Sequence, residues 1–138
     1  FVHPLTGLDH LLAMLAVSLW STQLGGRAVW LLPATFLGAI SLGSFALIGA
    51  PVALVESALI ASLLVFGFLV AVAEVGLAPI VGAFAIFHGG AHAGHLAASG
   101  DGGAYIIGMM AVSSVVLTLG AMLAQFAAET ARPCRRCR

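Results

Sequence analysis

Residues 52–72 read VALVESALIASLLVFGFLVAV, an apolar run in which Glu56 is the only charged side chain. A helix needs roughly 20 mostly apolar residues to cross a bilayer. A strand of a membrane β-barrel would instead alternate apolar and polar residues over ~10 positions, and the run does not alternate. This stretch therefore predicts a membrane-spanning helix.

The composition of the whole chain supports the same class of protein. The 138 residues are 62% hydrophobic and 7% charged, whereas soluble domains carry about 25% charged residues. The mean hydropathy is +1.16. We predict an all-α, polytopic transmembrane helix bundle whose main partner is the lipid bilayer. The formal net charge of zero argues against a nucleic-acid partner.

Similar apolar runs divide the chain into about five spans, which are separated by short segments rich in glycine and proline. The predicted spans cover about residues 5–20, 28–48, 52–72, 79–96 and 105–127. Together they form one transmembrane domain, residues 1–131, which a basic tail follows at residues 132–138. Small residues in the second and fifth spans would let helices approach closely, so a homo-oligomer is possible.

The basic residues predict one orientation. Arg27 and four arginines in the tail are the only basic residues besides histidine, and there is no lysine. With five spans, the loop after the first span and the tail lie on the same side of the membrane. The positive-inside rule places both in the cytoplasm and the N-terminus outside.

The fourth span contains the most unusual stretch, Phe87-His88-Gly89-Gly90-Ala91-His92-Ala93-Gly94-His95. In a helix, His88, His92 and His95 are spaced i, i+4 and i+7 and share one face. Ionisable side chains inside a membrane span are costly and face a protein interior or a water-filled cavity by default. We therefore expect these imidazoles to meet other polar groups inside the bundle.

The predicted topology supplies such groups at a similar depth in the outer half of the bundle. Imidazoles with a few carboxylates suit nickel, cobalt, zinc or copper. His88 and His95 are too far apart on a regular helix to hold one ion, so the spacing favours a relay over a single cage. The predicted metal ligands are His3, Asp9, His10, Glu56, His88, His92 and His95.

Two motifs resemble those of a known family of membrane proteins. The stretch from His3 to Met14, HPLTGLDHLLAM, looks like the first-span signature of the HupE/UreJ family, and Phe87–His92 resembles its second motif. Gly90 stands where that family usually has a histidine, and His95 is additional. The resemblance implies a multi-pass permease of the bacterial inner membrane for Ni²⁺, sometimes Co²⁺. By this resemblance, the candidate functional residues are His3, Asp9, His10, His88 and His92.

Other functions use the same residues differently. The chain could be a non-transporting metal- or haem-binding membrane protein, with two histidines as axial ligands, or a small-solute channel lined by histidine. An intramembrane metalloenzyme lacks support, since the chain has no His-Glu-x-x-His motif. We predict no enzyme activity, no catalytic residue and no permanently bound cofactor, with Ni²⁺, or Co²⁺ or Zn²⁺, as the transported ligand.

Overall fold

The computed structural model describes residues 7–73 and 78–130, and in these ranges the chain folds into five α-helices. The all-α prediction is confirmed. The helices are α2 (Leu8–Leu24), α3 (Ala28–Ala46), α4 (Val52–Val72), α5 (Ala78–Ala98) and α6 (Gly102–Thr130).

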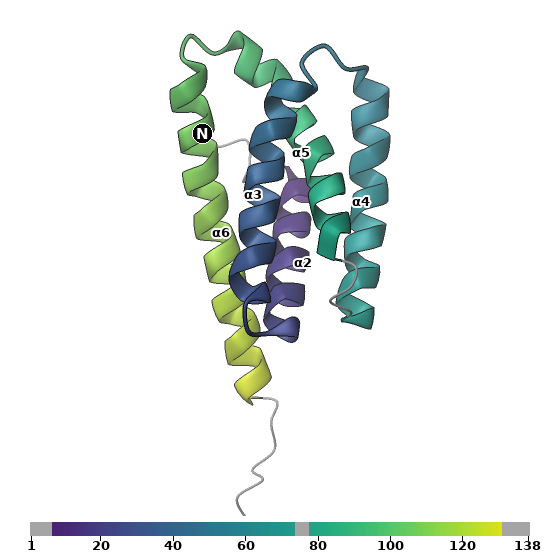
Figure 1. Ribbon diagram of the computed structural model, residues 1–138, viewed down its shortest axis with the longest axis vertical. Coiled ribbons are helices and arrows are strands. Elements are labelled where there is room, and N and C mark those ends of the chain that lie inside the picture. The colour runs from purple at the N-terminus through teal and green to yellow at the C-terminus, as the bar shows by residue number, and fades with distance from the viewer. Residues whose placement is uncertain (1–6, 74–77, 131–138) are drawn as a thin grey trace, which may run out of the picture.

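The helices lie side by side and alternate in direction along the chain (Figure 1). α2, α4 and α6 run downward in this view, while α3 and α5 run upward. α6 is the longest helix, with 29 residues, and its last turns extend below the other helices (Figure 1). The start of α2 therefore lies toward the same end of the bundle as the end of α5.

Glycines make the reversals between helices possible. Gly25 and Gly26, between α2 and α3, have φ angles of 68° and 55°. Gly49, between α3 and α4, has a φ angle of 79°. Side chains with a Cβ atom rarely adopt this left-handed region, whereas glycine does so without steric cost. These short turns bring consecutive helices back against each other.

Helix α2 occupies the middle of the bundle and packs against α3, α4 and α6. Its buried side chains recur mostly at intervals of three or four residues, which places them on one broad face. They are His10, Ala13, Met14, Val17, Ser18, Trp20 and Ser21. This face carries His10 into the interior together with the apolar core.

The most extensive helix pair is α3 with α5, and two glycines bring their backbones into contact. A methyl group on Gly43 would overlap the backbone carbonyl of Ile86, and one on Gly89 would overlap that of Ile40. Such close approach is typical of small residues between membrane helices. Because Gly89 lies next to His88, this crossing fixes where the histidines of α5 enter the core.

Three of the described helices, α3, α4 and α6, are long and apolar enough to cross a bilayer. Large apolar side chains also point away from the core, among them Trp30, Leu64 and Leu123, which are 76%, 74% and 66% exposed. Such a surface suits lipid rather than water, as expected of a membrane protein. That all five helices cross the membrane stays a prediction.

Candidate functional site

Three imidazoles from two helices meet inside the bundle. His10 of α2 and His88 and His92 of α5 are 4%, 0% and 1% exposed. Nδ1 of His10 lies 3.3 Å from Nδ1 of His88, and Nε2 of His10 lies 3.3 Å from Nε2 of His92. His10 therefore joins two histidines that are neighbours on one face of α5 but do not bond to each other directly.

Two further side chains extend this row of imidazoles. Oγ of Ser62, on α4, lies 2.7 Å from Nε2 of His88. The hydroxyl of Tyr105, on α6, lies 3.0 Å from Nδ1 of His92. Ser62 also donates a hydrogen bond to the backbone carbonyl of Leu59 at 2.6 Å. We call Ser62, His88, His10, His92 and Tyr105 the histidine chain; four helices contribute to it.

Aromatic rings surround the deeper part of the histidine chain. The ring of Phe66 stacks on that of His88, with centroids 6.0 Å apart and planes 14° apart. Phe36 lies 5.8 Å from His88 and 6.4 Å from His10, again between ring centroids. Both phenylalanines are almost completely buried. This packing holds the imidazoles in place and keeps their surroundings apolar.

The histidine chain runs inward from one end of the bundle. Tyr105, which is half-buried, is in the first turn of α6. Ser62 is ten positions after the start of α4, about 15 Å along the helix at 1.5 Å per residue. The histidine chain thus runs from the periphery of the bundle inward over about half the thickness of a bilayer's hydrocarbon core, which is about 30 Å.

The structure brings together three of the seven predicted metal ligands, namely His10, His88 and His92. Asp9 is half-buried beside His10 on α2. Glu56 is exposed, because the buried stripe of α4 includes Val55 and Leu59 but not the position between them that Glu56 occupies.

His95 is exposed, although its spacing predicts the same face as His88. The imidazoles of His88 and His92 contact His10 of α2. On α2, His10 is in the first turn, two positions after the start of the helix at Leu8. His3 lies outside the described residues.

Ser62 and Tyr105 were not among the residues expected from the sequence. Most serines in these helices donate back to a carbonyl of their own helix, as Ser41 and Ser57 do, and Ser62 shares that pattern. The feature of the sequence that could have identified Ser62 is its position on the buried stripe of α4. Tyr105, the only tyrosine, follows a loop and reads as an aromatic at the membrane interface.

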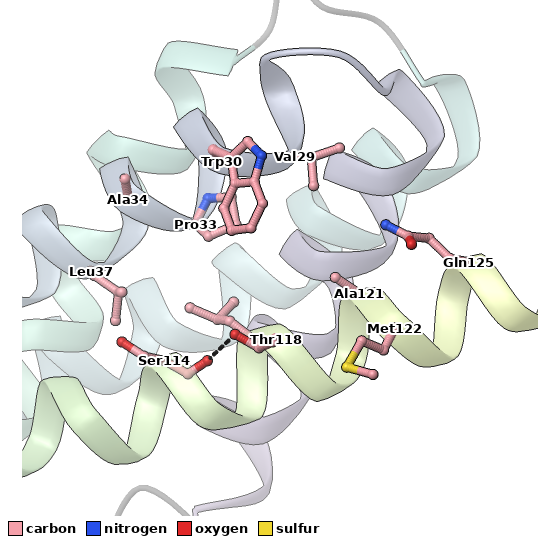
Figure 2. A pocket seen from close by; sticks show the side chains of 11 residues that line it. Val29, Trp30, Pro33, Ala34, Leu37, Ser114, Thr118, Ala121, Met122 and Gln125 are labelled. Carbon is pink, nitrogen blue, oxygen red and sulfur yellow. Dashed lines mark hydrogen bonds between the residues drawn. The ribbon is translucent and has the colours of Figure 1, made fainter.

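A separate pocket opens between α3 and α6 (Figure 2). Its volume is about 410 Å³, and it shares no residue with the histidine chain. The hydroxyl of Thr118 in its wall donates to the backbone carbonyl of Ser114 (Figure 2). Most of the other lining side chains are apolar. The lining residues are Val29, Trp30, Pro33, Ala34, Leu37, Ser114, Leu117, Thr118, Ala121, Met122 and Gln125. It offers no ligand set for a metal ion.

The ring nitrogens of the histidine chain face one another rather than a common point. Within residues 7–73 and 78–130, no three side chains of His, Cys, Asp or Glu are arranged to hold a metal ion as they stand. The donor type and burial suit a transition-metal ion, but a single ion could use only one nitrogen of His10. Ring rotation is therefore needed before the three imidazoles can share an ion.

Comparison with known proteins gives two matches. The family model described as "HupE / UreJ protein" matches residues 1–138. A curated protein from Rhizobium leguminosarum bv. viciae, "Protein HupE", is 37% identical over 128 residues, which cover 88% of this chain and 66% of the relative. The chain thus spans just under two thirds of the length of that relative. No solved structure matches.

Proposed function

Because this chain belongs to the HupE/UreJ family, we propose that it is a secondary permease for a divalent transition-metal ion. Ni²⁺ is the first candidate and Co²⁺ the second. The ion is cargo, and the proposal assigns no catalytic residue and no resident cofactor.

The observation that carries the proposal is the convergence of His10, His88 and His92 in the core. Buried ionisable residues in a membrane helix mark ion or proton pathways by default. Neutral imidazole is a good ligand for Ni²⁺ and Co²⁺. The aromatic packing against His88 excludes competing water, while the need for ring rotation keeps binding weak enough for release, as a permease requires.

We propose that all five helices cross the inner membrane of a bacterium, with the N-terminus outside. Two facts support this orientation. The connection between α2 and α3, which contains the exposed Arg27, lies at the same end of the bundle as the end of α6 (Figure 1). The arginines of the tail follow α6 in sequence, so the positive charges gather on one side, as the positive-inside rule requires.

In this orientation the remaining candidate ligands belong to the outer entrance. Glu56 is exposed near the start of α4 and His95 near the end of α5, and both helix ends are at the upper end of Figure 1. Asp9 directly precedes His10 in the first turn of α2, on the side of His10 toward this entrance. We propose that Asp9, Glu56, His95 and His3 attract or pass on the ion, while His10, His88 and His92 bind it.

The geometry does not favour haem at these histidines. Two axial ligands must face each other across a macrocycle, whereas His10 is in direct hydrogen-bond contact with both His88 and His92. A porphyrin has no space between either pair.

The test is uptake of Ni²⁺ by proteoliposomes that contain the full chain. We expect His10→Ala, His88→Ala and His92→Ala each to lower the saturable rate at least ten-fold. Thr118→Val is the control, since it removes a hydroxyl from α6 outside both the histidine chain and the proposed entrance, and it should leave the uptake rate unchanged. Unchanged Ni²⁺ uptake in all three core variants would contradict the proposal, and altered flux of a neutral solute in them would indicate a channel instead.

A further inference from the structure

The hydrogen bonds of Ser62 define a direction along the histidine chain. A serine hydroxyl has one proton, and a backbone carbonyl can only accept. Oγ of Ser62 lies 2.6 Å from the carbonyl oxygen of Leu59 and 2.7 Å from Nε2 of His88. The hydroxyl proton is therefore donated to Leu59, and Nε2–H of His88 donates to Ser62. In a neutral imidazole this leaves Nδ1 of His88 without a proton.

The same reasoning continues from ring to ring. Nδ1–H of His10 donates to Nδ1 of His88, so Nε2 of His10 accepts from Nε2–H of His92. Nδ1 of His92 then accepts from the hydroxyl of Tyr105. All three imidazoles are neutral in this arrangement, and each of their lone pairs already accepts a hydrogen bond. The histidine chain is thus closed by its own hydrogen bonds.

The exposure of the five residues indicates where an ion can open this arrangement. Ser62, His88, His10 and His92 are at most 4% exposed, whereas Tyr105 is half-buried. The bond between Tyr105 and His92 is therefore the one nearest the surface. Breaking it frees a nitrogen without exposing any of the deeper groups.

We propose that Tyr105 is a positioning residue that closes the proposed metal site. Its hydroxyl occupies Nδ1 of His92, and an incoming divalent cation displaces it to reach the first imidazole. Ser62, at the other end, sets the direction of hydrogen bonding that gives His92 this acceptor nitrogen. The inference rests on the proposed function, because it names a residue that controls access to the same site.

The first test needs no substitution. Nitrogen-15 NMR of the metal-free full chain, labelled at histidine, distinguishes protonated from unprotonated ring nitrogens. We expect protons on Nε2 of His88, Nε2 of His92 and Nδ1 of His10. A proton on Nδ1 of His92 would overturn the inference, since Tyr105 would then be the acceptor and would close nothing. The variant Ser62→Ala is used to assign the signals of the ring nitrogens. Ser113→Ala is the control, because Ser113 is a buried serine outside the histidine chain.

The second test is calorimetric titration of Ni²⁺ into the purified full chain. Removing one competing hydrogen bond in Tyr105→Phe should lower the Kd about five-fold. Thr118→Val, which removes a hydroxyl from another part of α6, should leave the Kd unchanged. Unchanged or weaker binding in Tyr105→Phe would overturn the closing role and leave the permease proposal standing. Absence of Ni²⁺ binding by the unsubstituted chain would instead overturn the proposed function.

Discussion

The hydroxyl of Ser18 lies 3.0 Å from the carbonyl oxygen of Leu117 and so joins α2 to α6. The same hydroxyl is 2.8 Å from the carbonyl oxygen of Met14 in its own helix, so one proton is shared between two acceptors. Gly120 leaves the space for this contact, because a Cβ atom there would lie 2.9 Å from Oγ of Ser18. This contact fixes α2, and with it His10, relative to the helix that carries Tyr105.

We predict that Ser18→Ala lowers the free energy of unfolding by about 0.6 kcal/mol, the average for a hydrogen bond between membrane helices. The measurement is reversible unfolding in mixed detergent micelles. Ser57→Ala is the control, since Ser57 is exposed and donates within its own helix to Ala53, and we expect no measurable change. Equal effects of the two substitutions would contradict a role for Ser18 between helices.

The crossing of α3 and α5 gives a larger predicted effect. Gly89→Ala places a methyl group on the carbonyl of Ile40, and overpacking of this kind costs about 2 kcal/mol. Gly94 is the control on the same helix, because a Cβ atom there has open space around it. Gly94→Ala should leave stability unchanged or raise it by up to about 1 kcal/mol, since alanine favours the helix.

Thermal unfolding in detergent measures both glycine variants. Nickel-binding titration adds a second measurement, since a displaced α5 would move His88 and His92 away from His10. Gly89→Ala with the unfolding temperature and the Ni²⁺ affinity of the unsubstituted chain would show that the helices are not in backbone contact.

The exposed carboxylate of Glu56 provides a test of the outer entrance. Removing one negative charge near the site of entry lowers the local concentration of a divalent cation. We expect Glu56→Gln to raise the KM for Ni²⁺ uptake about two- to five-fold at low ionic strength and to leave the maximal rate unchanged. The increase should shrink in high salt, because exposed charges are screened.

Glu129→Gln is the matched control for the entrance, since Glu129 is exposed near the end of α6 at the opposite end of the bundle. We expect the KM of external uptake to be unaffected. A fall in the maximal rate for Glu56→Gln, with an unchanged KM, would assign Glu56 to a later step than capture.

The helices could be predicted from the sequence because lipid exposure leaves long apolar runs. The run at 52–72 coincides with α4 as the structure defines it. The start predicted at residue 5 lies outside the described residues. The longer α6, Gly102–Thr130, begins and ends beyond the predicted range of 105–127, because helical hydrogen bonding continues through polar and small residues that a hydropathy limit excludes.

The core of the candidate site could also be predicted from the sequence. His88 and His92 share one face of a helix, and His10 is a polar residue in an apolar span, where it needs a hydrogen-bonding partner. The rotation of each helix about its axis could not be predicted. That rotation decides that Ser62 reaches an imidazole while Glu56 points outward, and it follows from packing among several helices. The ends of the histidine chain therefore required the structure.

The backbone contact at Gly43 and Gly89 has a consequence for motion. Two helices that touch through their glycines cannot slide or roll without driving neighbouring side chains into the opposite main chain, so α3 and α5 move as one body. The imidazoles of His88 and His92 move with this body, because they belong to α5. Any change in the spacing between His10 and the two imidazoles of α5 then requires α2 to move relative to this body.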